Sequence, residues 1–141
     1  MGKINTARWI LCGVIAGIVG DLVEILINGI LLGPNWERAL RMLNRPPFNG
    51  TQMIDFNVLG LVIGLTAVWI YAGSRPRFGP GPKTAIYAGL ATWILASVLP
   101  NTFFMVIPHL FSRHLALFAT IGDFFACILG TLVGAALYKE A

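Results

Sequence analysis

Three carboxylates and one amide lie inside apolar stretches of this sequence, where polar side chains of this kind are rare. Asp21, Glu24 and Asn28 belong to the stretch GVIAGIVGDLVEILIN, and Asp123 belongs to a second stretch nearer the carboxyl end. An ionised Asp at the centre of a membrane helix costs about 3 kcal/mol. Such residues are therefore kept mainly where they bind or transfer something, and the chemistry that suits them is proton exchange or the binding of a cation.

The spacing of these residues predicts that they face one interior. Intervals of four, three and four residues, which place side chains on one face of a helix, separate Gly17, Asp21, Glu24 and Asn28. If the helix that contains Asp123 is a neighbour, three acids share one cavity. The apolar stretches contain no Lys or Arg deep enough to neutralise them, so we expect at least one acid to hold a proton at neutral pH.

Two plainer interpretations of the polar residues stay open. A protonated acid can hold helices together through a hydrogen bond to a backbone carbonyl or to Asn28, worth about 1 kcal/mol. His109 and His114 could ligate a metal or a haem iron, but a separation of five residues across an expected turn matches no specific motif. The sequence contains no phosphate-binding loop, zinc pattern or nucleophile elbow. The sequence therefore identifies no cofactor, and whether the protein binds one is unknown.

The composition excludes an ordinary soluble domain. Hydrophobic residues make up 57% of the 141 residues and charged residues only 11%, whereas a soluble domain needs a charged surface. The ten Lys and Arg residues give a formal net charge of +4, but they are scattered at the ends of the apolar stretches. Membrane proteins place cations there to meet anionic headgroups. The lipid bilayer, and not nucleic acid, is the expected partner.

The hydrophobic pattern predicts an all-α polytopic membrane protein with a single domain over residues 1–141. Four membrane-spanning helices are expected at about 10–32, 56–72, 84–106 and 115–138. The amphipathic segment 35–44, with Asn35 as its N-cap, predicts a short helix at the membrane interface. The segment SRPRFGPGPK, residues 74–83, predicts a rigid turn outside the bilayer.

Small residues predict where these helices pack, because helices in lipid associate by close backbone approach. The pairs at helical spacing are Gly13 and Gly17, Gly60 and Gly64, and Gly130 and Gly134. Pro100 blocks the hydrogen bond to the Ala96 carbonyl and predicts a kink in the third spanning helix. Asn101 either lines a cavity opened by that kink or caps the broken helix. We expect Pro100 and Asn101 to form the gate of any transport path.

The segment NG-x-LLG-x-x-W, from Asn28 to Trp36, and the plan of four helices resemble small uncharacterised bacterial membrane proteins of the domain-of-unknown-function kind. The resemblance implies a bacterial inner membrane and transfers no activity. Four spans put both termini on one side, where six Lys and Arg residues face four on the other side. The positive-inside rule therefore predicts cytoplasmic termini, although so small a difference leaves a dual topology open.

Three functions of different classes fit this pattern. The first is a small homo-oligomeric carrier or channel in which Asp21, Glu24 and Asp123 exchange a proton or bind a cation while the third helix gates access. The second is a non-catalytic accessory subunit of a larger membrane complex. The third is an enzyme acting on a lipid or isoprenoid, with one acid as proton donor and another as base. The first is preferred, because only it uses the costly carboxylates directly. An enzymatic function is not favoured.

Overall fold

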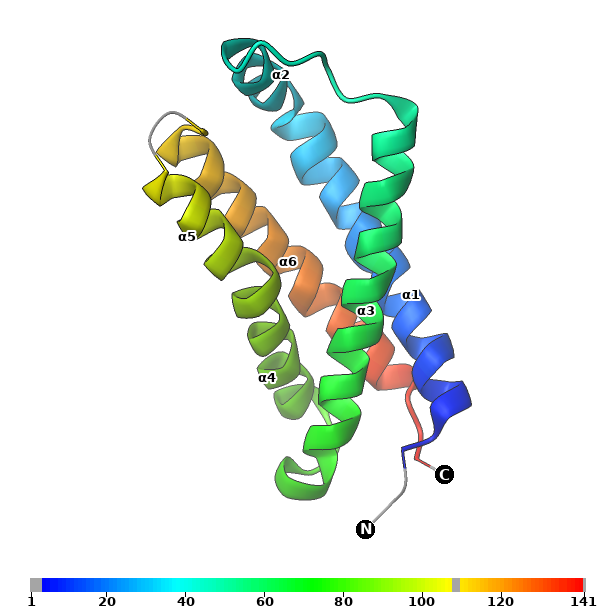
Figure 1. Cartoon of the computed structure of the whole chain (residues 1–141). Helices are drawn as coiled ribbons and strands as arrows, with labels where there is room; N and C mark the ends of the chain where they lie inside the picture. Colours follow the sequence, from blue (N-terminus) through cyan, green and yellow to red (C-terminus); the bar gives the residue numbers. More distant parts are fainter. Residues whose placement is uncertain (1–3, 108–109, 141) are drawn as a thin grey trace.

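The computed structural model describes residues 4–107 and 110–140 of the chain. The regular secondary structure of these residues is entirely helical, as Figure 1 shows. Four helical segments are long and apolar enough to cross a membrane: Thr6–Leu31, Gly50–Phe78, Pro82–Val106 and Arg113–Leu137. The prediction of an all-α chain with four candidate spans is confirmed, and these spans indicate an integral membrane protein.

The described residues form six α-helices and two π-helical segments, of which five α-helices and both π-helical segments build the four spans. In chain order these are α1 (Thr6–Glu24), η1 (Ile25–Leu31), α2 (Gly33–Met42), α3 (Gly50–Phe78), α4 (Pro82–Trp93), η2 (Ile94–Val98), α5 (Leu99–Val106) and α6 (Arg113–Leu137). The first span joins α1 to η1, and the third joins α4, η2 and α5. The short helix α2 connects the first two spans and has no buried residue.

The helix α1 lies between α3 and α6, and α4 completes the bundle by contacting both α6 and α3. A cluster of buried residues, which includes Val68, Tyr71 and Tyr138, fills the end of the bundle that carries both termini. There the backbone N–H of Asn5 donates a hydrogen bond to Tyr138 Oη over 3.1 Å. Towards the opposite end, α3 diverges from η2 and α5 (Figure 1). The helices therefore pack around a buried core at one end of the bundle and spread apart at the other.

Glycines permit the close crossings of α1. A Cβ atom on Gly17 would lie 2.6 Å from Leu61 Cα of α3, and one on Gly130 of α6 would lie 2.5 Å from the Ala16 carbonyl oxygen. The other predicted packing glycines, Gly13, Gly60, Gly64 and Gly134, also lie where an added Cβ would collide with a neighbouring helix. All three predicted glycine pairs therefore lie at the crossings of α1 with α3 and α6.

Several helix ends differ from the prediction. The second span covers Gly50–Phe78 instead of 56–72 because Asn49 and Gln52 form a capping box at its start. At its end, Pro76 is accommodated in the last turn of α3. The segment predicted to be a turn over 74–83 is thus a turn only near Gly79 and Gly81, which have positive φ angles of 79° and 128°.

The start of α2 and the region of Pro100 also differ from the prediction. Asn35 is not the N-cap of α2, because that helix begins at Gly33 and has a proline in its first turn. Before Pro100 the chain widens into η2, where the Leu99 N–H donates to the Ile94 carbonyl. This wider turn makes room for the proline ring without ending the helix. A second widened segment, η1, contains Asn28 and was not predicted.

Candidate functional site

The structure contains a cavity of about 540 Å³ between the helices, in the half of the bundle away from the termini. It extends from Gly130 and Thr131 on α6 to Trp36 on α2 and Phe48 before α3. Its walls come from every described helical element except α4. Pockets of about 300 to 1,000 Å³ hold small-molecule ligands, so the cavity has the volume of a binding site.

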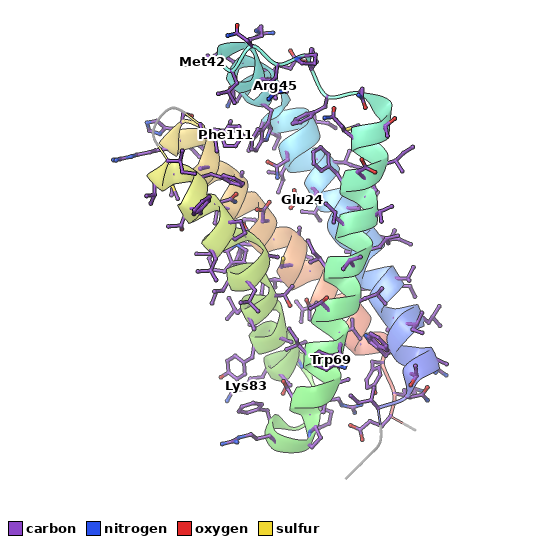
Figure 2. All side chains as sticks on the ribbon, in the orientation of Figure 1. Glu24, Met42, Arg45, Trp69, Lys83 and Phe111 are labelled. Carbon is purple, nitrogen blue, oxygen red and sulfur yellow. The ribbon has the colours of Figure 1, made fainter. Side chains whose placement is uncertain are left out.

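The predicted polar residues of the first and fourth spans all line this cavity. The Asn28 side-chain nitrogen lies 2.5 Å from Glu24 Oε2 and 3.2 Å from Asp123 Oδ1, so one amide donates to two carboxylates. Figure 2 labels Glu24 in the space between the helices. Glu24 and Asp123 come from α1 and α6, which pack against each other. The structure thus brings together acids that are 99 residues apart in the sequence.

A second set of hydrogen bonds connects Asp123 to the third span. Asp123 Oδ2 accepts a hydrogen bond from the Ser97 hydroxyl and lies 3.3 Å from Asn101 Nδ2. Asn101 Nδ2 is also 2.9 Å from Thr120 Oγ1. Asn101 therefore faces the cavity and acts as a polar link between α5 and α6. The predicted role of Pro100 and Asn101 as a gate stays a prediction.

Asp21 lies apart from this network, about one helical turn before Glu24 on α1. Its carboxylate occupies the space where Gly60 of α3 would carry a Cβ. Any larger residue at position 60 would displace the carboxylate from the cavity wall. Gly60 thus has a second role besides helix packing, since it makes room for an acid at the interface between α1 and α3.

The charges that line the cavity are all negative. Asp21, Glu24, Glu37 and Asp123 line it, and none of the described residues in its wall is Lys, Arg or His. The two ion pairs in the described part of the chain lie elsewhere or at its edge: Glu37 with Arg41 at 3.6 Å, and Arg75 with Glu140 at 3.4 Å. The three acids of the spans therefore have no cationic partner among residues 4–107 and 110–140.

Trp36 lines the cavity at its α2 end and packs against further aromatic residues. The Trp36 indole N–H donates to Asn28 Oδ1 over 3.1 Å. Its ring packs edge-to-face on Phe111, with centroids 5.3 Å apart, and Phe111 packs in the same way on Phe104 at 5.7 Å. In Figure 2, Phe111 lies at the same end of the bundle as Arg45 and Met42. Asn28 is thus fixed from both sides, by the acids and by Trp36.

Sequence reasoning missed several residues of the site. It assigned Trp36 to the interface and did not consider Glu37 as a lining residue. Ser97 precedes Asn101 by four positions and Thr120 precedes Asp123 by three. Helical spacing between small hydroxyl residues and the selected polar residues was a usable signal for these two.

His114 does not join the site. His114 is exposed at the start of α6, and His109 lies outside the described residues. Within the described ranges, no group of three His, Cys, Asp or Glu side chains is arranged to hold a metal ion. The free thiol of Cys127 does line the cavity, whereas Cys12 is buried at the crossing of α1 and α6.

Comparison with family models, curated proteins and solved structures finds no match for this chain. The resemblance of the Asn28–Trp36 segment to small bacterial membrane proteins therefore stays a prediction.

Proposed function

We propose that this protein is a small membrane carrier that binds a cation in the acid-lined cavity in exchange for protons. The observation that carries the proposal is the charge of the cavity wall. Asp21, Glu24 and Asp123 line it without a cationic partner among the described residues, and Glu37, which pairs with Arg41, lies at its edge. Uncompensated acids at membrane depth are costly and mark ion or proton pathways. A bound cation or a proton supplies the missing positive charge.

The geometry around Asn28 supports competition between the two. Glu24 and Asp123 accept hydrogen bonds from one amide nitrogen, so the two carboxylates are close neighbours. Two adjacent carboxylates repel each other when both are ionised, and either a shared proton or a bound cation relieves that repulsion. A cation that binds to the pair therefore displaces the proton that the two carboxylates share. This competition is the elementary step of proton-coupled exchange.

The third span supports a conformational step. The buried core closes the end of the bundle that carries the termini, whereas the cavity reaches the α2 end. Opening the closed end requires a helix to shift, and the π-helical turn before Pro100 is a place where a helix can bend. With the termini in the cytoplasm of a bacterium, as the sequence predicts, the cavity faces the opposite side of the inner membrane.

Flux measurements test the proposal. The protein is reconstituted into liposomes that contain a pH-sensitive dye and an acidic lumen, and tetraethylammonium, choline, Na⁺ or K⁺ is added outside. Quaternary ammonium ions are suitable probes because they cannot cross the bilayer as neutral bases. We expect at least one of these cations to drive proton efflux, and we expect Glu24→Gln and Asp123→Asn each to reduce the rate at least tenfold.

The matched control is Asp55→Asn, because Asp55 is exposed on α3 and does not line the cavity. Its rate should stay within twofold of the wild type. Equal rates for the wild type and the Glu24→Gln variant would refute the carrier proposal and favour an accessory role. A homo-oligomeric state stays a prediction, which the mass of the detergent-solubilised particle tests.

A further inference from the structure

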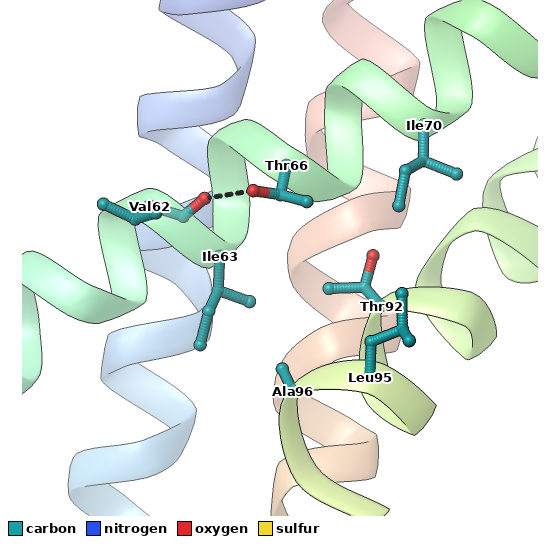
Figure 3. A pocket seen from close by; sticks show the side chains of 7 residues that line it. All are labelled: Val62, Ile63, Thr66, Ile70, Thr92, Leu95 and Ala96. Carbon is teal, nitrogen blue, oxygen red and sulfur yellow. Dashed lines mark hydrogen bonds between the residues drawn. The ribbon is translucent and has the colours of Figure 1, made fainter. Parts of the chain in front are cut away.

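An apolar groove runs along the outside of the bundle where α3 faces the third span. Val62, Ile63, Thr66 and Ile70 form its α3 wall. Figure 3 shows Thr92 of α4 with Leu95 and Ala96 of η2 on the other side. The groove has a volume of about 180 Å³. An engineered protein cavity of ~150 Å³ holds a benzene molecule, so this groove can hold a short length of hydrocarbon.

The two threonines of the groove have no hydroxyl hydrogen left to donate to a ligand. Thr66 Oγ1 donates to the Val62 carbonyl over 2.9 Å, as the dashed line in Figure 3 shows. Thr92 Oγ1 donates in the same way to the Ala88 carbonyl over 2.9 Å. Because both hydroxyl hydrogens are donated to their own helices, the groove presents mainly methyl and methylene groups. It suits an alkyl chain better than a hydrated ion.

The groove lies directly beside the acid-lined cavity. Ile63 and Ala96 line both spaces, so these two side chains form the boundary between groove and cavity. Ser97, the neighbour of Ala96, donates its hydroxyl hydrogen bond to Asp123. The inner wall of the apolar groove is therefore adjacent to the carboxylate network.

The outer edge of the groove faces the surface that lipid would cover. Val62 is 52% exposed and Leu95 is 62% exposed, and both belong to segments apolar enough to span a membrane. An amphiphile dissolved in the bilayer meets this edge with its chain already in hydrocarbon. Its headgroup would then have to be cationic, because the cavity behind the groove carries only negative charges among the described residues.

We propose that the cation bound by this protein is a single-chain amphiphile, whose cationic head lies among Glu24, Asp123 and Asp21 and whose alkyl chain lies in the groove between α3 and η2. This inference rests on the carrier proposal and specifies its substrate class. The groove serves as the lateral path from the bilayer, and Ala96 is the point where head and chain separate. The substrate reaches the acids sideways, without first crossing the water at the α2 end.

The test compares two quaternary cations that share a headgroup. Radiolabelled tetramethylammonium and dodecyltrimethylammonium are bound to protein in nanodiscs, and binding to empty nanodiscs is subtracted. In Thr66→Phe, the phenyl ring fills the groove from an exposed position of α3 that lines the groove and not the cavity. We expect the affinity for the dodecyl compound to fall at least tenfold, while the affinity for tetramethylammonium changes less than twofold. The control is Ala136→Phe, because Ala136 is exposed on α6 and lines neither space. It should change neither affinity.

The outcomes separate the two proposals. If Thr66→Phe leaves the dodecyl affinity unchanged, or lowers both affinities equally, the alkyl chain does not use the groove and the substrate-class proposal is overturned. The carrier proposal still stands in that case, provided that Glu24→Gln abolishes the binding of tetramethylammonium. If neither compound binds to the wild type above the level of empty nanodiscs, both proposals fail for quaternary cations. Retention of tetramethylammonium by Thr66→Phe shows that the variant is folded.

Discussion

Replacing Gly64 by alanine should weaken the bundle, although alanine is the better helix former. A Cβ on Gly64 would lie 2.5 Å from the Gly13 carbonyl oxygen and 2.5 Å from Gly17 Cα. Since carbon atoms pack at ~3.5 Å or more, α1 and α3 must separate by about 1 Å. Overpacking of this kind costs about 1 to 3 kcal/mol, which exceeds the gain of about 1 kcal/mol from the higher helix propensity of alanine.

Gly73 provides the matched control within the same helix. It lies in α3, and a Cβ there would meet nothing within 4 Å. Gly73→Ala should therefore raise the free energy of unfolding by about 1 kcal/mol at most, while Gly64→Ala lowers it. Unfolding by sodium dodecyl sulfate in mild-detergent micelles, followed by circular dichroism, measures both variants. Equal stability of the two variants would refute the close crossing of α1 and α3.

Two further substitutions test the polar groups at the two ends of the bundle. Asn28→Ala removes the hydrogen bonds to Glu24, Asp123 and Trp36 and should cost about 2 kcal/mol, at ~0.6 kcal/mol for each bond in a membrane. The control in the same unfolding assay is Asn57→Ala, which should cost about 0.5 kcal/mol or less. Among the described residues, the Asn57 side chain bonds only to the Met53 carbonyl of its own helix. Equal costs of the two substitutions would contradict the bridging role of Asn28. Arg75→Ala should cost about 2 kcal/mol, because the guanidinium lies 5.8 and 5.4 Å from the ring centroids of Tyr71 and Tyr138. An effect of Glu140→Gln as large as that of Arg75→Ala would show that the ion pair with Glu140, and not the aromatic contact, stabilises this end.

The parts of the fold that depend on local chemistry could be predicted from the sequence. Apolar stretches long enough to cross a bilayer identify four helices, because the length of a span is set by membrane thickness. The spacing of Gly17, Asp21, Glu24 and Asn28 predicts that they share one face of the first span. In the structure every one of these residues lines the cavity or the crossing with α3.

The parts that depend on neighbouring helices could not be predicted. The sequence does not say that α1 packs against α6, so the proximity of Glu24 and Asp123 was only conditional. The π-helical segments η1 and η2 escape periodicity analysis, because one extra residue in a turn leaves no clear signature in sequences this apolar. Glu37 was missed for a related reason. On an amphipathic helix an acid is expected to face water, and only the position of α2 over the bundle brings Glu37 to the cavity.

The exchange of cation for proton can be measured most directly on the purified protein. In weakly buffered micelles, a pH indicator reports protons that are released when tetramethylammonium or dodecyltrimethylammonium is added. We expect close to one proton per cation bound by the wild type and by Asp55→Asn, and close to none by Glu24→Gln. Because a quaternary cation has no titratable proton, any released proton comes from the protein. Cation binding without proton release, or equal release by Glu24→Gln, would contradict exchange at the acids that Asn28 joins.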